Sequence, residues 1–224
     1  GGGGNRPSAT PAIKERGFEN ISSTVQSCVN NYSKDNDRLT DIKNDSFEGY
    51  IISLNCRDAI KGYPDKTYRS DERITRGQMA KYIVNSFKIP INKAGSNFID
   101  IRNDEIFYDY IITLKNSNIA SGFADGTYRP GDFVKRQEVS KFIVEAIKVK
   151  GVNIYSKDAT YLDLDPYNKF RGYIGFLSSE DVNNEKIIQG FSDGSYRPND
   201  YVTRGQMAKI IENSVRYLEK YKAI

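Results

Sequence analysis

Three arginines, Arg76, Arg136 and Arg204, stand where a positive side chain is poorly tolerated. Each falls in the first turn of a predicted helix, where the helix dipole already places about half a positive charge. An arginine in this place is unfavourable unless a negative group joins it. Its planar guanidinium suits a carboxylate or a phosphate, which it can contact through two nitrogens at once. The three arginines therefore predict binding of an anion.

The residues after two of these arginines favour the same chemistry. Gly77 and Gly205 follow Arg76 and Arg204, and a glycine in a helix costs about 1 kcal/mol relative to alanine. It also leaves backbone amides uncovered, and a helix N-terminus with free amides attracts anions. A glutamine comes next in both copies, completing a Thr-Arg-Gly-Gln sequence that matches a capping box. Capping alone explains the glutamines, Gln78 and Gln206, but their place beside the arginines makes them candidate ligand contacts too.

An alternative pairs the arginines with carboxylates of the chain itself. Short motifs of the form LTDI, FIDI and YLDL contribute Asp41, Asp100 and Asp163. Asp100 or Asp163 of a neighbouring motif could neutralise an arginine, since structural salt bridges are common and repeats copy them readily. The three aspartates are therefore candidates both for ligand contacts and for internal partners.

Aromatic residues recur in Gly- and Asp-rich loops ahead of the arginines. Tyr68, Tyr128 and Tyr196 are expected to pack inside, while the loop glycines are expected to provide turns with positive φ. Another set could either pack or stack on the faces of sugar rings. Its members are Tyr63, Phe123 and Phe191.

These residues belong to a segment that is repeated three times in the sequence. Residues 62 to 87, 122 to 147 and 190 to 215 align without gaps, and each begins with a glycine at the same distance from its arginine. Apolar residues upstream repeat at the i, i+3, i+4, i+7 spacing of an amphipathic helix. They are Phe47, Tyr50, Ile51 and Leu54, then Phe107, Tyr110, Ile111 and Leu114, then Phe170, Tyr173, Ile174 and Leu177. A second helical stripe follows each arginine, so each repeat is predicted to be helix, loop, helix.

A unit this short cannot bury its own apolar faces, so the three repeats are predicted to pack together. The third repeat carries an insertion between Leu177 and Gly190, expected to be a surface elaboration. A weaker helical pattern around Ile13, Phe18 and Val29 predicts a further helix within residues 12 to 32, packed on the first repeat.

The composition excludes several functions. The chain of 224 residues has 33 basic and 29 acidic residues in mixed order, which argues against nucleic acid as a partner. It has no histidine, so triad hydrolases and most zinc sites are excluded. Loops such as DGTYRPGD lack the spacing of a calcium loop, and no metal or cofactor is expected. No apolar run is long enough for membrane insertion. Cys28 and Cys56 could pair in an oxidising compartment or remain free.

The repeats resemble S-layer homology domains. The resemblance rests on the F-x-D-I motif, the G-[YF]-x-D-G-[TS]-[YF]-R-P loop and the T-R-[AG]-[EQ] motif, and extends from residue 39 to about residue 217. It implies a mainly α fold, with three helix-loop-helix repeats packed as a pseudo-threefold, trimer-like spindle. It also implies that grooves between adjacent repeats bind a secondary cell wall polymer, typically with pyruvylated sugars. The arginine that contacts the acidic pyruvyl group corresponds to Arg76, Arg136 and Arg204.

The sequence departs from the family pattern in places. The second repeat begins its helix with Lys-Arg-Gln-Glu, so it lacks the capping threonine and adds a further positive charge at the start of the helix. Lys66 replaces the usual loop glycine in the first repeat. Phenylalanines stand where the family often has tryptophan, which should preserve packing but removes an indole N–H donor. These are Phe47, Phe107 and Phe170.

We therefore predict a non-enzymatic anchor that is extracellular, lies at the cell wall or S-layer, and binds an anionic polysaccharide attached to peptidoglycan. One chain would act as a monomeric pseudo-trimer. The predicted parts are a linker or expression remnant (1–12), a helical extension (13–38), repeats 1, 2 and 3 (39–92, 98–150 and 161–217) and a tail (218–224).

Two alternatives remain. One is a self-associating structural module of a surface lattice that does not touch glycan. The other is a glycan-processing enzyme, which would need two acids in a unique setting. Asp65, Asp125 and Asp193 instead recur in every copy.

Overall fold

The computed structural model describes residues 22–36, 38–95, 97–155, 157–179, 185–222 and 224. This part of the chain is mainly α-helical, as predicted, and contains isolated β-bridges but no strand. None of its helices is both long enough and apolar enough to cross a membrane. The elements are α1 (Ser23–Asn31), a 3-10 helix (Tyr32–Lys34), α2 (Glu48–Cys56), α3 (Arg76–Ser86), α4 (Tyr108–Asn116), α5 (Arg136–Val149), α6 (Arg171–Ser178) and α7 (Arg204–Lys220).

The first helix of each repeat follows the predicted apolar stripe. α2, α4 and α6 each begin directly after the phenylalanine that opens the stripe. The last two positions of the stripe are fully buried in all three copies, which confirms the helical spacing. They are Ile51 and Leu54, Ile111 and Leu114, and Ile174 and Leu177.

The second helix of each repeat begins at the arginine. In α3 the Thr75 hydroxyl accepts from the Gln78 amide at 3.3 Å, and the Gln78 side chain accepts from the Thr75 amide at 3.1 Å. α7 has the same capping box, so this prediction is confirmed in both repeats. In α5 the Glu138 carboxylate accepts from the Lys135 amide at 2.9 Å, but a lysine side chain cannot accept a hydrogen bond. Only half of the box is present there.

A ring of backbone hydrogen bonds joins the three repeats just before these helices. The amide of Ile74 donates to the carbonyl of Val202 at 2.9 Å, Val202 donates to Val134 at 3.0 Å, and Val134 donates to Ile74 at 3.2 Å. All three side chains are fully buried. The ring requires repeat 3 to meet repeat 1, although the two are far apart in sequence.

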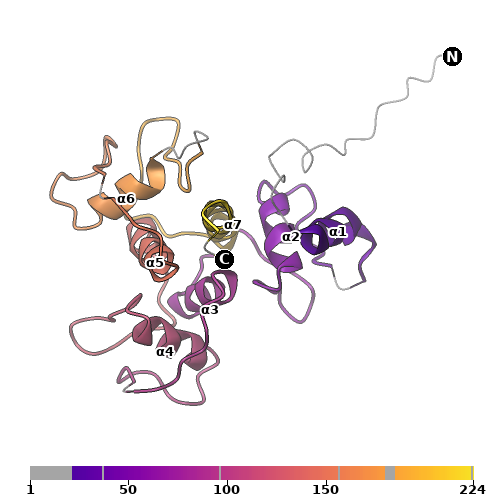
Figure 1. Cartoon of the computed structure of the whole chain (residues 1–224), viewed down its shortest axis with the longest axis horizontal. Helices are drawn as coiled ribbons and strands as arrows, with labels where there is room; N and C mark the ends of the chain where they lie inside the picture. The colour runs from indigo at the N-terminus through magenta and orange to yellow at the C-terminus, as the bar shows by residue number, and fades with distance from the viewer. Residues whose placement is uncertain (1–21, 37, 96, 156, 180–184, 223) are drawn as a thin grey trace.

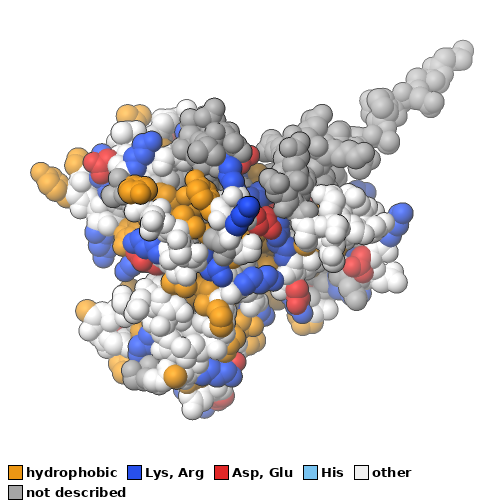
Figure 2. Space-filling view, in the orientation of Figure 1, with side chains coloured by type: hydrophobic (Ala, Val, Ile, Leu, Met, Phe, Trp, Pro, Cys, Tyr) orange, Lys and Arg blue, Asp and Glu red, His pale blue; other side chains and the backbone are white. Residues whose placement is uncertain are grey.

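The second helices form the centre and the first helices surround them (Figure 1). α3 packs against α4, α5 against α6, and α7 against α2. Each inner helix therefore supports the outer helix of the next repeat. Figure 2 shows basic side chains among apolar ones around the centre of this face.

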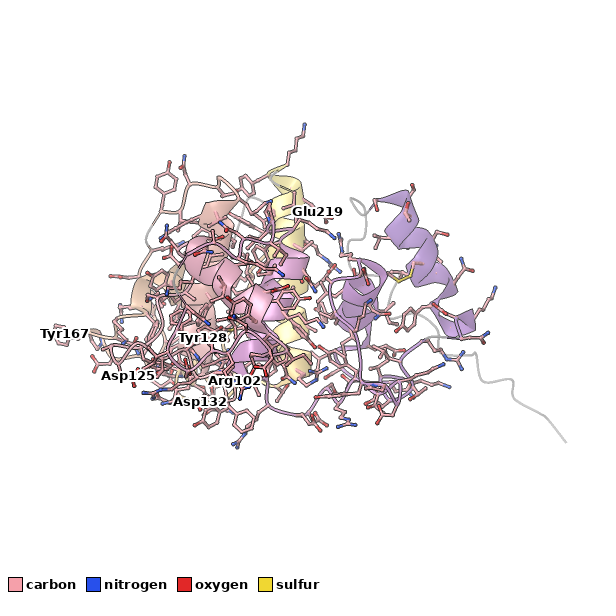
Figure 3. All side chains as sticks on the ribbon, turned by 90° about the horizontal axis from the view of Figure 1, so that it is seen from below. Arg102, Asp125, Tyr128, Asp132, Tyr167 and Glu219 are labelled. Atoms are coloured by element: carbon pink, nitrogen blue, oxygen red, sulfur yellow. A yellow bond between two sulfur atoms is a disulfide. The ribbon has the colours of Figure 1, made fainter. Side chains whose placement is uncertain are left out.

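The N-terminal extension is covalently tied to repeat 1. Cys28 of α1 and Cys56 of α2 form a disulfide with 5.8 Å between their Cα atoms, which resolves the alternative that the sequence left open (Figure 3). Val29 and Tyr32 are buried. Of the stretch predicted to be helical, residues 12 to 21 lie outside the described residues. So do residues 180–184 of the repeat 3 insertion.

Candidate functional site between adjacent repeats

Each of the three arginines reaches into the loop of the next repeat around the ring. Its Nε donates to a tyrosine carbonyl oxygen, and the hydroxyl of the same tyrosine donates back to the arginine's carbonyl oxygen. The Nε to oxygen distances are 2.7 Å for Arg76 and Tyr128, 2.9 Å for Arg136 and Tyr196, and 2.8 Å for Arg204 and Tyr68. The return distances are 3.1, 3.3 and 3.0 Å. The same junction is thus built three times.

Aromatic rings enclose these guanidiniums. The Arg76 Cζ lies 4.7 Å from the ring centroids of both Phe123 and Tyr128. Arg204 and Arg136 have matching neighbours in Tyr63 with Tyr68 and in Phe191 with Tyr196. The arginines are only 5%, 7% and 4% exposed in chain order. Cation–π attraction of this kind contributes most when the cation is desolvated.

No carboxylate of the described residues lies within 4.0 Å of a guanidinium nitrogen of these arginines. The predicted alternative, neutralisation by Asp100 or Asp163, is therefore wrong. Asp100 instead accepts from the amides of Tyr128 at 2.8 Å and Arg129 at 2.6 Å, and Asp41 and Asp163 hold the same two amides of their own loops. These aspartates fix a loop residue with positive φ: Arg69, Arg129 or Arg197.

The helix N-termini are not the open anion sites that the sequence predicted. The amides of Arg76 and Gly77 donate to the carbonyls of Asp132 and Pro130, both at 2.9 Å. The amides at the start of α5 and α7 are used in the same way. The prediction of uncovered amides at Gly77 and Gly205 is wrong because the next loop docks there and supplies carbonyl oxygens.

Close packing explains the two glycines. A Cβ on Gly77 would lie 2.4 Å from Cδ2 of Phe107, and one on Gly205 would lie 2.4 Å from Cδ2 of Phe47. At these two junctions the phenylalanine that precedes the outer helix therefore rests on the inner helix of the preceding repeat. Gln137 replaces glycine at the third junction, where its Oε1 accepts from the Asn168 side chain at 2.8 Å.

The loop aromatics lie close to a second arginine each. The Cζ atoms of Arg69, Arg129 and Arg197 lie 4.0, 4.1 and 3.8 Å from the ring centroids of Tyr63, Phe123 and Phe191. Each ring therefore contacts two guanidiniums, one from its own loop and one from the preceding repeat. The rings remain half-buried, and sugar stacking on them stays a prediction.

The loop carboxylates form hydrogen bonds and ion pairs within their own loops. Asp65 binds the hydroxyl and amide of Thr67 and the guanidinium of Arg69, and Asp125 and Asp193 make the same set of contacts. These hydrogen bonds, led by the one from the hydroxyl, lower the pKa of each carboxyl to about 2. Figure 3 shows Asp125 and Tyr128 at the end of the molecule opposite Glu219 of α7.

Comparison with known proteins identifies the family. The sequence profile described as the S-layer homology domain matches residues 38–80, 97–140 and 180–208. The chain belongs to the S-layer homology domain family. These three matches confirm the three tandem repeats that the sequence predicted.

Three relatives are similar to most of this chain. Cell surface glycoprotein 1 of Acetivibrio thermocellus is 26% identical over 70% of this chain and 7% of its own length. An uncharacterized cell wall amidase of Bacillus anthracis is 26% identical over 82% of this chain and 33% of its own length. The cellulosome-anchoring protein of A. thermocellus is 22% identical over 70% of this chain and 35% of its own length. The chain thus spans about a third or less of these curated relatives.

The sequence analysis did not single out three lysines on the inner helices, two of which lie beside a tyrosine of the next repeat. Lys81, Lys141 and Lys209 stand at one shared position after each S-layer homology arginine, and all three are half-buried. The Nζ of Lys81 lies 5.8 Å from the ring centroid of Tyr110, and that of Lys209 lies 5.7 Å from Tyr50. Their recurrence at one position of the three aligned repeats could have indicated a shared role. A lysine on a helix usually lies on a solvent-exposed face, so the recurrence alone did not point to a binding site.

Proposed function

We propose that this chain is a non-enzymatic anchoring module that holds an extracellular protein at the bacterial cell wall. It would bind an anionic, pyruvylated secondary cell wall polysaccharide non-covalently, through grooves between its repeats. One observation carries the proposal: three nearly buried guanidiniums have no carboxylate partner within 4.0 Å among the described residues. A desolvated cation without a counterion is costly, and an acidic ligand would supply the missing charge.

The names of the relatives support a place at the cell surface. They include a cell surface glycoprotein, a cellulosome-anchoring protein and surface layer proteins. Others are named as an amidase and an endoglucanase. Because this chain covers a minor part of each, we assign the anchoring role to the shared segment and any catalysis to the remainder of those proteins.

The arrangement of the repeats supports a monomer that acts as a pseudo-threefold, trimer-like spindle. The three junctions have the same hydrogen bonds, and the ring of backbone bonds closes within one chain. Several grooves on one molecule can engage one polymer at once, so moderate affinity at each groove gives strong attachment through effective concentration.

The recurring loop aspartates and the buried Glu212 are poorly suited to glycan hydrolysis. A general acid must be protonated near the working pH, whereas Asp65, Asp125 and Asp193 have a pKa of about 2. Burial raises the pKa of Glu212, but this residue is fully buried and faces Arg57 and Arg216. A substrate could not reach it.

Co-sedimentation with purified cell wall sacculi tests the proposal. We expect the chain to sediment with intact sacculi and to stay in solution with sacculi stripped of secondary polymer. Polymer that has lost its pyruvyl groups should bind at least about tenfold more weakly, because a charge-assisted hydrogen bond contributes about 1.5 to 3 kcal/mol. Equal binding to intact and stripped sacculi would contradict the proposal. Sedimentation of the chain without sacculi would favour the self-associating alternative.

A further inference from the structure

The groove between repeats 1 and 2 contains a pocket away from the arginine junction. Its volume is about 430 Å³, and it lies beside α3, Tyr110 of α4 and the segments that follow α2 and α3. Val84 and Ile89 are buried at its base, and Ile91 is half-exposed. Three lysines, one carboxylate and one amide complete the lining: Lys61, Lys81, Lys88, Asp58 and Asn85.

The pocket carries unbalanced positive charge. Lys61 forms an ion pair with Asp58 at 3.2 Å, but both side chains are largely exposed, so water weakens the pair. No carboxylate of the described residues lies within 4.0 Å of the Nζ of Lys81 or Lys88. The Lys88 Nζ donates to the Arg57 carbonyl oxygen at 3.4 Å, which satisfies a hydrogen bond without neutralising the charge.

One of the two equivalent lysines between repeats 2 and 3 is neutralised. Glu145 stands where repeat 1 has Asn85, and its carboxylate pairs with Lys148 at 3.0 Å. Lys148 is the counterpart of Lys88, and it also lies 5.6 Å from the ring centroid of Tyr173. The two grooves therefore share lysines and a tyrosine but differ in net charge.

In the groove between repeats 3 and 1, one of the two equivalent cations is likewise neutralised. Its residue at the Lys88 position is Arg216, which pairs with the buried Glu212 at 3.0 Å. Lys209 and Tyr50 remain at the positions of Lys81 and Tyr110. The pocket between repeats 1 and 2 has the least compensated charge of the three.

We propose that this pocket is a dedicated binding site for an acidic sugar unit, and that the three grooves are unequal. The inference rests on the proposed wall-binding function and deepens it. Lys81 and Lys88 would bind a carboxylate or phosphate group of the sugar, and Tyr110 and Ile91 would contact its apolar face. Sites of this kind combine an apolar lining with a few convergent polar groups, and aromatic rings supply part of that lining.

The test compares two double variants of equal net charge in the sacculus assay. Lys81→Gln with Lys88→Gln changes the proposed pocket, and Lys141→Gln with Lys148→Gln changes the same positions between repeats 2 and 3. We expect the first to weaken binding about tenfold or more, as the loss of charge-assisted hydrogen bonds implies, and the second less than about twofold. The first variant should also lose much of the salt dependence of binding, because salt screens exposed charges. Unchanged melting temperatures would show that both variants are folded.

A third variant tests the neutralising role of Glu145. Glu145→Asn introduces the residue found at this position in repeats 1 and 3, and we expect tighter binding. Competition with soluble polymer fragments shows which acid the pocket binds. One set of fragments lacks the ketal-linked carboxyl groups and another lacks phosphate, and the set that no longer competes identifies the acidic group. If the unmodified chain binds sacculi but both double variants weaken binding equally, the pocket assignment fails and the anchoring function stands. If the unmodified chain binds no sacculi, the anchoring function itself fails.

Discussion

Lys66 shows how one residue adapts a shared loop at a cost. Its φ is 62°, and the glycines at the same position, Gly126 and Gly194, have φ values of 83° and 78°. A side chain in this left-handed region costs about 1 to 2 kcal/mol. The Lys66 Nζ donates to the carbonyl of Asn36 at 2.9 Å, a contact that recovers part of this cost at the surface.

Replacing Lys66 with glycine should stabilise the chain. We expect Lys66→Gly to raise the free energy of unfolding by about 0.5 to 1 kcal/mol, because relief of backbone strain exceeds the extra entropy of glycine in the unfolded state. Gly126→Lys is the matched reverse substitution and should lower it by about 1 kcal/mol. Urea unfolding followed by circular dichroism measures both. A gain in stability from Gly126→Lys would show that the strain argument is wrong.

At the scale of elements, α1 is held chiefly through its C-terminal end. Most of its side chains are exposed, whereas Val29 is buried and the adjoining Tyr32 hydroxyl donates to Asn55 at 3.1 Å. The Cys28–Cys56 disulfide ties α1 to α2 across 28 positions of sequence. Closing a loop of this size substantially lowers the conformational entropy of the unfolded chain.

Reduction of the disulfide should destabilise the chain by about 3 kcal/mol. The expected readout is a lower melting temperature in dithiothreitol than in its absence. Cys28→Ser with Cys56→Ser should melt at the lower temperature in both conditions, which serves as the control. Wall binding should persist at temperatures where the chain stays folded, since α1 lies outside the proposed pocket. A melting temperature that is the same with and without reductant would contradict the prediction.

At the scale of the whole molecule, the contact between repeats 3 and 1 has a feature that the other two lack. Glu212 of α7 accepts from the Ser53 hydroxyl at 2.8 Å and lies within 3.5 Å of Arg57. The equivalent residues are Val84 and Val144. This buried charged cluster lies where the chain must close its ring between its two most distant repeats.

Removing one partner of this cluster should be costly. We expect Glu212→Ala to lower the free energy of unfolding by about 3 kcal/mol, because it leaves a cavity and removes the buried carboxylate that faces Arg57 and accepts from the Ser53 hydroxyl. Glu212→Val with Arg57→Ser copies Val84 and Ser117, the equivalent residues at the contact between repeats 1 and 2, and should recover most of that loss. Denaturant unfolding compares the two variants. A double variant no more stable than Glu212→Ala would show that the position requires the charge itself.

The sequence was informative about local structure and composition of the site, but not about how its groups are used. The capping boxes and the apolar stripes were predicted because helix starts and helix periodicity are local. The role of Gly77 was misjudged because the ring that excludes a Cβ there, Phe107, comes from another repeat. The internal ion pair considered as an alternative for Asp100 was wrong for a different reason, since backbone amides of its own loop occupy both oxygens.

The sequence by itself determined the three repeats, their mainly helical character and the family, because each depends on spacing along the chain. Only the tertiary structure decided which repeat each arginine contacts, that the helix amides are already bonded, and that the two cysteines pair. It also distinguished the three grooves. Groove charge depends on side chains from segments that meet only after the ring closes, such as Lys81 of α3 and Tyr110 of α4. No spacing within one repeat encodes that meeting.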